Sequence, residues 1–333
     1  RLYGLKLTMN FGTDYTDYQR TLVYDKEHGN AAQQGGRLSK TNTRTLSYTF
    51  NQLLTHDRTF GDHSLNLLAG HEYYRYKYNY ALGEKTGIVG GIDELGPAVT
   101  TTDNNSYSHN YGVESYLARI NYGFKSRYYI DASWRTDGSS RFHPSDRWGH
   151  FWSVGASWRI SEEQFMENPR QWLDNLTLKV SYGVQGNDNL GTYYAWQGLY
   201  DYTWPNATDA GAFVDKLENR KVTWEKNGNL NAGIEATMFG GRLGVSVEYY
   251  NRKTRDMLLN SPLPISTGFT GFNDNVGSLR NQGLEVSLRG TILDKRDFRW
   301  DATLMGSFNR NKVLSLTGGQ DVITSGIRVI EVG

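Results

Sequence analysis

The stretch YYIDASWRTDGSSRFHPSDRWGHFWSVGASWRI, residues 128–160, shows most clearly the pattern from which the fold is predicted. Apolar side chains stand at every second position on both sides of a polar connection. They are Tyr128, Ile130, Ala132 and Trp134 before it, and Trp152, Val154, Ala156, Trp158 and Ile160 after it. Since successive side chains of a β-strand point to opposite faces, this period predicts two antiparallel strands, each with one apolar and one polar face.

The same two-residue period recurs along the chain and predicts eleven strands. They are expected at residues 3–15, 43–58, 64–80, 110–122, 127–136, 148–160, 174–186, 222–238, 242–259, 278–291 and 298–311. The chain is therefore predicted to be all-β and antiparallel.

The links between the expected strands alternate between short and long. Residues 16–42, 81–109 and 186–221 form long links, whereas the links near residues 61–63, 123–126, 239–241 and 294–297 are tight turns. On the short side, the one longer link is residues 161–172. That one is expected to hold a helical turn capped by Ser161. Short turns on one side and long loops on the other are typical of a sheet that lies between water and lipid.

Strand length and charge placement bear on what covers the apolar faces. Several expected strands alternate over at least nine residues, and a strand that crosses a bilayer needs about 9 to 11, against about 5 to 6 in soluble proteins. Tyr122 and Tyr128 stand near a turn, where an aromatic girdle meets lipid headgroups. The charged side chains keep to the polar phase: Arg119, Asp131, Arg135, Arg159, Lys179, Glu248, Glu285, Arg289 and Asp301. These features favour an antiparallel transmembrane β-barrel.

Composition narrows the function. Lys plus Arg number 36 and Asp plus Glu 35, so the net charge of +1 offers no general attraction for nucleic acid. The absence of cysteine excludes disulfides and thiolate sites. No run approaches the ~20 apolar residues of a spanning helix. The chain opens inside a strand-like pattern and without a signal peptide, which leads us to expect an internal piece of a longer polypeptide.

Several sequence blocks carry a family resemblance. The first is RTDGSSRF, which comprises Arg135, Thr136, Asp137, Gly138, Ser139, Ser140, Arg141 and Phe142, followed by Arg147, Trp148 and Gly149 and by SVGASWRISEEQF. Later blocks are LTLKVSYGVQGND at 176–188, VTWEKNGNLNAGIE at 222–235, GGRLGVSVEYYNRKTRDML at 240–258 and VGSLRNQGLEVSL at 276–288. In this order they resemble the SusC/RagA class of TonB-dependent outer-membrane transporters.

The resemblance implies a 22-stranded barrel in the bacterial outer membrane. It further implies an N-terminal plug, energy supplied through TonB, a SusD-like surface lipoprotein as lid, and import of glycans, oligosaccharides or peptides. The sequence departs from that pattern because it shows no recognisable plug, no TonB-binding segment and no C-terminal strand ending in an aromatic residue. Residues 1–333 are therefore expected to be about 11 strands of the barrel domain, with further chain on both sides.

The loop WQGLYDYTWPNATD, residues 196–209, is the leading candidate for contact with solute or lid. Trp196, Tyr200, Tyr202 and Trp204 offer flat apolar rings, and Asp201 and Asn206 offer hydrogen-bonding groups. Sugar sites combine these two kinds of group. The alternative, which we favour, is that the aromatic rings pack the loop against its neighbours or the lid. Residues 101–111 are a weaker candidate.

Catalytic and metal-binding patterns are missing. No GxSxG, HExxH or Walker motif occurs, and the histidines are dispersed. We therefore expect no enzyme activity, cofactor or metal. The RTDGSSRF segment is expected to be structural: a loop with a turn at Gly138 and local pairing of Arg135, Asp137 and Arg141.

Two other functions stay open. One is a siderophore or vitamin receptor built on the same barrel. The other is a soluble carbohydrate-binding sandwich or glycosidase, whose catalytic carboxylates would lie within about 5 to 9.5 Å of each other.

Overall fold

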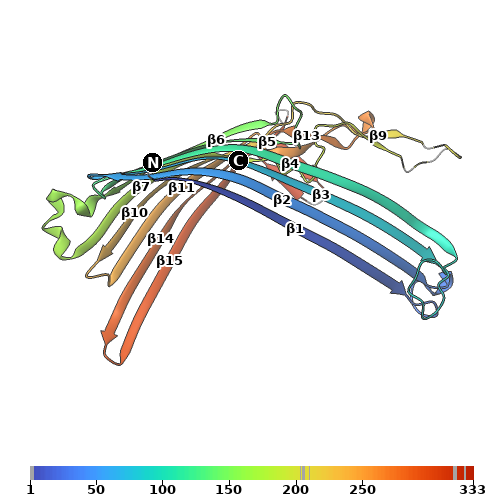
Figure 1. Cartoon of the computed structure of the whole chain (residues 1–333), viewed down its shortest axis with the longest axis horizontal. Helices are drawn as coiled ribbons and strands as arrows, with labels where there is room; N and C mark the ends of the chain where they lie inside the picture. The colour runs from blue at the N-terminus through green and yellow to red at the C-terminus, as the bar shows by residue number, and fades with distance from the viewer. Residues whose placement is uncertain (1–3, 203, 205–206, 210, 318–320, 326–327) are drawn as a thin grey trace. The chain divides into compact units, whose positions relative to one another are not determined.

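The computed structural model describes residues 4–202, 204, 207–209, 211–317, 321–325 and 328–333. Throughout this part of the chain, regular structure is confined to β-strands and short 3₁₀ helices (Figure 1). The prediction of an all-β chain is confirmed.

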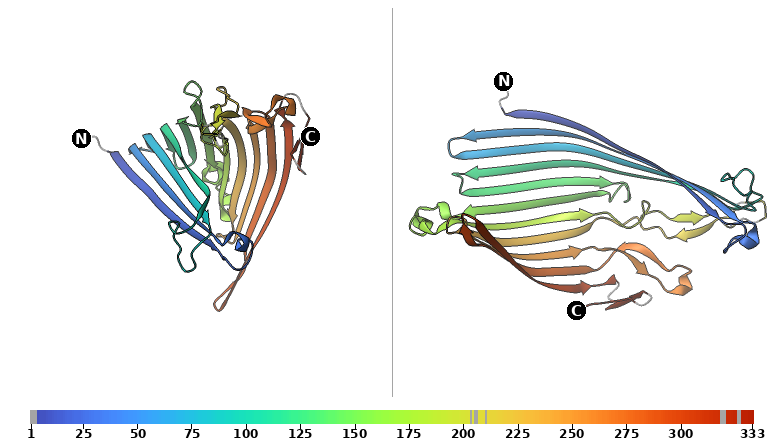
Figure 2. Two further views of the ribbon diagram at one scale, coloured as in Figure 1. Left: turned by 90° about the vertical axis from the view of Figure 1, so that its right-hand side faces the viewer. Right: turned by 90° about the horizontal axis from the view of Figure 1, so that it is seen from below.

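One sheet of eleven strands dominates. Its strands follow one another in chain order, as the right-hand view of Figure 2 shows. They are β1 (Leu5–Tyr24), β2 (Arg37–Phe60), β3 (His63–Thr86), β4 (Thr100–Phe124), β5 (Tyr128–Ser139), β6 (Trp148–Arg159), β7 (Leu173–Asn187), β10 (Glu225–Met238), β11 (Leu243–Arg255), β14 (Ser278–Lys295) and β15 (Phe298–Ser315). The pairs from β5 to β15 are antiparallel throughout.

Smaller elements occupy the links. Three two-stranded ribbons are formed by β8 (Leu199–Asp201) with β9 (Phe213–Lys216), β12 (Leu258–Pro262) with β13 (Gly271–Asn275), and β16 (Val322–Ser325) with β17 (Arg328–Glu331). The 3₁₀ helices are η1 (Ala32–Gln34), η2 (Ile160–Glu162), η3 (Gln164–Met166), η4 (Pro169–Gln171) and η5 (Ile265–Thr267).

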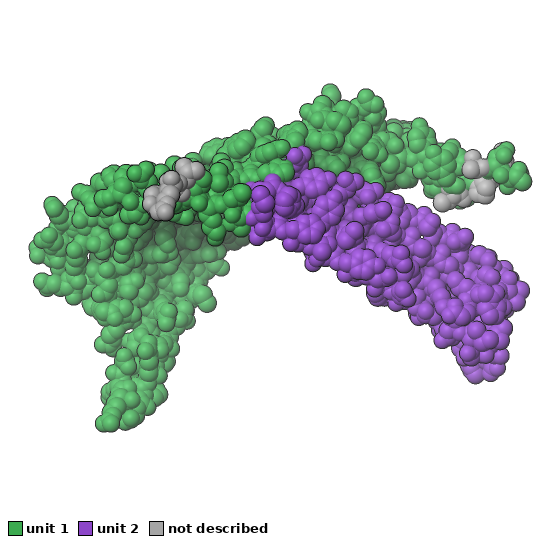
Figure 3. Space-filling view, in the orientation of Figure 1, with its two compact units in different colours: residues 1–8, 53–71, 115–333 green, residues 9–52, 72–114 purple. Residues whose placement is uncertain are grey.

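The chain divides into two compact units, coloured separately in Figure 3. Unit 1 comprises residues 1–8, 53–71 and 115–333, and unit 2 comprises residues 9–52 and 72–114. Strands β1 to β4 contribute residues to both units, whereas β5 to β15 lie wholly in unit 1.

All eleven expected strands exist, but the first four are longer than predicted. Strand β1 continues to Tyr24 instead of residue 15, β2 begins at Arg37 instead of 43, β3 ends at Thr86 instead of 80, and β4 begins at Thr100 instead of 110. The expected links 16–42 and 81–109 therefore shrink to 25–36 and 87–99. Most of residues 14–22 are exposed on both faces, so the hydrogen-bonded ladder continues there without an apolar period.

Two local predictions were wrong. The segment Arg135 to Ser139 is not a loop but the end of β5, where Gly138 pairs with Trp148. In the link 161–172 the expected helical turn is present, as the short 3₁₀ helices η2, η3 and η4, but the predicted cap is wrong because none of the three has a side-chain cap. The Ser161 hydroxyl instead donates to the Asn175 side chain at 3.5 Å.

A tight turn links β4 to β5. Lys125 and Ser126 both adopt positive φ, at 52° and 53°. This backbone matches the right-handed twist of the flanking strands. The Lys125 amide also donates to the carbonyl oxygen of Asp62 at 2.8 Å, which joins this turn to the β2–β3 turn.

Candidate functional site

The two faces of unit 1 differ in chemistry across seven strands. One continuous cross-strand row contains no charged side chain: Ile130, Ala156, Val180, Ala232, Tyr249, Leu284 and Phe308. The row one residue away is polar or small: Asp131, Gly155, Ser181, Asn231, Tyr250, Gly283 and Asn309. Val180 keeps 44% of its surface exposed. The apolar face is thus a broad uncovered surface, which marks an interaction site.

Aromatic rings border the apolar face at the short-turn end. Successive ring centroids of Phe60, His63, Phe124, Tyr128 and Trp158 lie 5.0, 4.9, 6.3 and 6.4 Å apart. The Tyr122 hydroxyl, 2.6 Å from His63 Nδ1, joins the series. Tyr122 and Tyr128 are the residues at which the sequence analysis places a girdle.

A second group of rings lies toward the long loops. Tyr116 and Trp148 are 6.2 Å apart, as are Trp134 and His150, and Trp152 lies 5.6 Å from Tyr182. Along β4, the span from Tyr116 of one group to Phe124 of the other, both included, is nine residues. That is the length at which a tilted strand crosses the hydrocarbon layer.

The polar face bounds a hollow of about 1090 Å³. Small hydroxyl and amide side chains dominate its wall, with fewer charged groups. The wall includes Ser133, Ser153, Ser181, Asn229, Asn231, Asn281 and Asn309 together with Asp131, Arg135, Glu248, Arg252 and Glu285. Such a wall forms hydrogen bonds with water or polar solute, and all its charged positions fall in the predicted polar phase.

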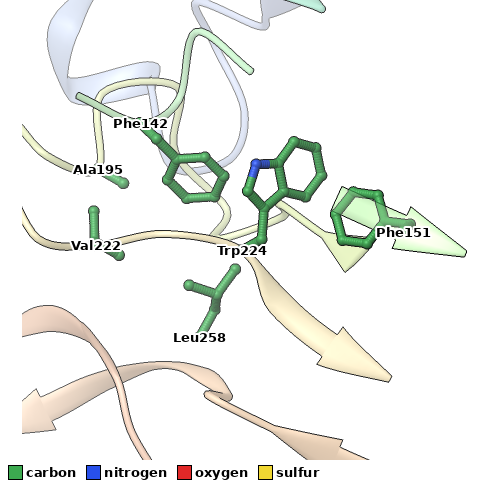
Figure 4. Close-up of a cluster of buried hydrophobic side chains, with 6 residues drawn as sticks. All are labelled: Phe142, Phe151, Ala195, Val222, Trp224 and Leu258. Atoms are coloured by element: carbon green, nitrogen blue, oxygen red, sulfur yellow. The ribbon is translucent and has the colours of Figure 1, made fainter. Parts of the chain in front are cut away.

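A buried apolar cluster lies where the long loops of unit 1 meet. Its members are Phe142, Phe151, Ala195, Val222, Trp224 and Leu258. Figure 4 shows the Trp224 indole between the rings of Phe142 and Phe151, whose centroids lie 5.4 and 5.2 Å away. This cluster was not predicted from the sequence. The available signal was Phe151, a large apolar residue in the polar phase of β6.

Two arginines of the RTDGSSRF segment make different contacts. Arg135 Nε donates to Asp137 Oδ1 at 2.6 Å, and a terminal nitrogen of Arg135 donates to the Ser115 hydroxyl at 2.8 Å. Arg141 instead lies 3.1 Å from Asp188 Oδ1, on the link after β7. Arg135 thus pairs locally with Asp137, as predicted, whereas the ion pair of Arg141 is with Asp188, 47 positions away.

Asp188 is the centre of a network of contacts with Ser139 and Arg141, which we call the anchoring network. Its Oδ2 accepts from the Ser139 hydroxyl at 2.7 Å, and its carbonyl oxygen accepts from Arg141 at 3.1 Å. The Arg141 guanidinium also lies over the Tyr193 ring, 5.3 Å from its centroid. Gly138 lies against Trp148, since a Cβ on Gly138 would be 2.9 Å from the indole. Gly149 and Phe142 are buried, and Ser140 is exposed directly after β5.

The predicted contact residues divide into two groups. Trp196 packs against the buried cluster and lies edge-on to His143 with centroids 4.9 Å apart. Tyr200, Tyr202 and Trp204 are exposed, Trp204 at 68%. Asp201 is half-buried in β8, and Asn206 lies outside the described residues. The structure thus separates one packing aromatic residue from three accessible ones.

Glu163 organises the short-turn side and was also missed. Its carboxylate accepts hydrogen bonds from the Tyr128 hydroxyl and, at 3.0 Å, from Trp158 Nε1, and lies 3.5 Å from Arg127. The hydrogen bond from Tyr128, and then that from Trp158, hold the pKa of Glu163 below its usual range. The link 160–172 therefore fixes two girdle residues.

A search of the described residues finds no group of three or more His, Cys, Asp or Glu side chains arranged to hold a metal ion. The same residues contain no helix long and apolar enough to cross a membrane.

A wide antiparallel sheet with long strands, one apolar face edged by aromatic rings and one polar face defines the wall of an outer-membrane β-barrel. The family model described as TonB dependent receptor-like, beta-barrel, matches residues 2–329, and the chain belongs to this family.

Individual proteins resemble the chain over most of its length. TonB-dependent receptor P26 of Formosa agariphila is 33% identical over 87% of the chain and 30% of the relative. TonB-dependent receptor SusC of Bacteroides thetaiotaomicron is 29% identical over 96% of the chain and 32% of the relative. The solved RagAB peptide transporter superimposes with a TM-score of 0.93 and 29% identity, over 100% of this chain and 38% of that one. The chain thus spans about a third of the length of these proteins.

Proposed function

We propose that the complete protein imports nutrients across the outer membrane, with energy supplied by TonB through a plug and with a SusD-like surface lipoprotein as lid. The superposition on the RagAB peptide transporter, over the whole of this chain, is the observation that carries the proposal. The similarity to SusC over 96% of the chain supports the same class of transporter.

In this scheme the described residues form wall and loops rather than a reacting centre. The hydroxyl and amide groups on the polar face keep the lumen hydrated, and the apolar face holds the sheet in lipid. We propose a transporter and not an enzyme. The solute is a glycan, an oligosaccharide or a peptide. A siderophore or vitamin is the less favoured alternative, because the chain is 29% identical to both SusC and the RagAB peptide transporter but 13% identical to the siderophore receptor PiuA of Acinetobacter baumannii.

We further propose that the ribbon of β8 and β9 contacts the solute or the lid. Tyr200, Tyr202 and Trp204 support this role because their rings are exposed, and Tyr200 lies in β8, where it pairs with Val214. Tyr202 and Trp204 follow β8 in the chain. Asp201 is a hydrogen-bonding neighbour, and Asn206 is included from the sequence alone. Trp196 is assigned to packing, since it contacts the buried cluster.

Uptake by whole cells tests the import proposal. Cells expressing the complete protein receive labelled oligosaccharides, oligopeptides or ferric chelates, with and without functional TonB. We expect TonB-dependent uptake of an oligosaccharide or a peptide. Uptake of the ferric chelate alone, or uptake that persists without TonB, would contradict the proposal.

Paired substitutions test the ribbon. Tyr200→Ala combined with Trp204→Ala is compared with Phe165→Ala, which removes a similarly exposed ring (67%) from the short-turn side. Stacked rings contribute about 0.5–1.5 kcal/mol each beyond their buried area, so we expect solute or lid affinity to fall about tenfold in the first variant only. Equal affinities in the two variants would exclude the ribbon from binding.

A further inference from the structure

The apolar face changes chemistry abruptly toward the long-loop ends of β11, β14 and β15. Tyr249, Leu284 and Phe308 lie in one cross-strand row. Two residues further along each strand, the same face carries Asn251, Gln282 and Arg310. Two residues further again it carries Lys253, Arg280 and Lys312. The surface therefore passes from apolar to amide to cationic within about 13 Å along the strands.

The cations of the last row face one another directly. Lys253 is paired with Arg280, and Arg280 is paired with Lys312. The register shows no bulge between these pairs and the apolar row, so all three side chains belong to the apolar face. Directly opposite positions place Cβ atoms about 4.5–5.5 Å apart, and like charges there destabilise a sheet.

Nothing in the described residues neutralises this row. Lys253, Arg280, Arg310 and Lys312 make no ion pair there, and Arg280 Nε is buried without a hydrogen-bond partner in the same set. The carboxylates of the neighbouring strands, Glu235, Glu248 and Glu285, fall on the opposite, polar face. Three repelling cations and an unpartnered guanidinium nitrogen point to a missing anion.

We propose that Lys253, Arg280, Arg310 and Lys312 bind the phosphate groups of a phosphorylated lipid headgroup in the outer leaflet. Long loops of such barrels face outward, so the long-loop side meets that leaflet. The cations continue the lipid-facing surface directly beyond its apolar row, which places them at headgroup depth. A phosphate monoester carries about −1.5 to −2 charges and accepts paired hydrogen bonds from a guanidinium. A single headgroup thus supplies the charge that the row lacks.

The site does not depend on the import function, so its test needs no transport assay. The complete protein is purified in neutral detergent and mixed with nanodiscs of zwitterionic lipid, with or without a phosphorylated glycolipid. The test variant is Lys253→Gln, Arg280→Gln and Lys312→Gln together. The control variant removes three cations from the opposite face of the same sheet: Lys179→Gln, Arg252→Gln and Arg289→Gln. Native mass spectrometry measures retained lipid, and thermal unfolding measures stability.

We expect the test variant to lose at least about tenfold in retention of the phosphorylated lipid, since each cation near a charged lipid surface contributes severalfold. The control variant should retain it. In neutral detergent the test variant should unfold at the same temperature as the unchanged protein or at a higher one, because the repulsion between cations is relieved. In nanodiscs that contain the phosphorylated glycolipid, the unchanged protein should have the higher unfolding temperature. A test variant that carries Arg280→Lys instead of Arg280→Gln should recover part of the retention of the phosphorylated lipid.

Three binding results, and one stability result, would overturn the proposal. The first is equal retention by the test and control variants. The second is equally tight binding of inorganic phosphate, which would show a general anion site instead of a lipid site. The third is unchanged lipid retention with loss of a co-purifying acidic protein, which would assign the row to a protein partner. A test variant that unfolds early in neutral detergent would contradict the repulsion on which the inference is built.

Discussion

Trp224 Nε1 donates a hydrogen bond to the carbonyl oxygen of Arg147 at 2.8 Å. This contact joins residues that are 77 positions apart and ties the segment leading into β10 to the start of β6. Because the indole also lies between Phe142 and Phe151, Trp224 connects three segments of unit 1.

Replacing Trp224 with Ala should loosen these segments. Removing a buried tryptophan creates a cavity and costs about 3 to 5 kcal/mol, and it also leaves the Arg147 carbonyl oxygen without this donor. We expect faster proteolysis within residues 188–224 and a lower unfolding temperature. Trp204→Ala, which removes an exposed indole from the same link, should change neither. Equal effects of the two changes would exclude Trp224 as the connecting residue.

Replacing Arg141 with Ala should release the link after β7. Arg141 and Asp188 are only 13% and 14% exposed, and breaking such a pair costs about 3 kcal/mol or more. The control is Arg299→Ala, whose pair with Asp301 is exposed to solvent and therefore contributes little to stability. Hydrogen exchange of residues 186–195 measures the difference. Protection that is unchanged by Arg141→Ala would show that Asp188 is held by other contacts.

Replacing Gly149 with Ala should overpack the buried cluster. A Cβ there would lie 2.4 Å from Phe151 and 2.9 Å from Trp224, and both rings are confined by their neighbours. Overpacking of this kind costs about 1 to 3 kcal/mol. Gly306→Ala is the control, since its Cβ would meet nothing within 4 Å. Thermal unfolding should separate the two variants, and a stable Gly149→Ala protein would contradict the close packing.

Glu163 should make the short-turn side sensitive to acid. Its pKa is lowered in the folded state, chiefly by the hydrogen bond from Tyr128. Its stabilising contribution is therefore present above the ordinary glutamate pKa of about 4.3, and it is lost as the pH falls through the lowered value. The unfolding temperature of the unchanged protein should exceed that of Glu163→Gln at pH 7, and the gap should close below about pH 4. A gap that is constant with pH would refute this role.

The sequence predicted the strands well where one face is apolar, because apolar residues such as Val180, Ile234 and Leu284 recur at every second position within their strands. It missed the ends of β1 and β4, where nearly all side chains on both faces are exposed and show no apolar period, since ladder hydrogen bonds leave no trace in side-chain polarity. The anchoring network was hidden for another reason. Arg141 meets Asp188 across 47 positions, and polar residues of this kind resemble turn chemistry until the fold brings them together.

Spin labels can show directly that lipid covers the face of Val180 and water the face of Ser181. The chain contains no cysteine, so spin labels can be placed singly at Val180→Cys and Ser181→Cys in the complete protein, with any other cysteines removed. In a bilayer, we expect the label at 180 to relax faster with oxygen and to be shielded from a water-soluble nickel chelate, and the label at 181 to show the reverse. Equal exposure of both labels to the chelate, or the opposite order, would contradict the account.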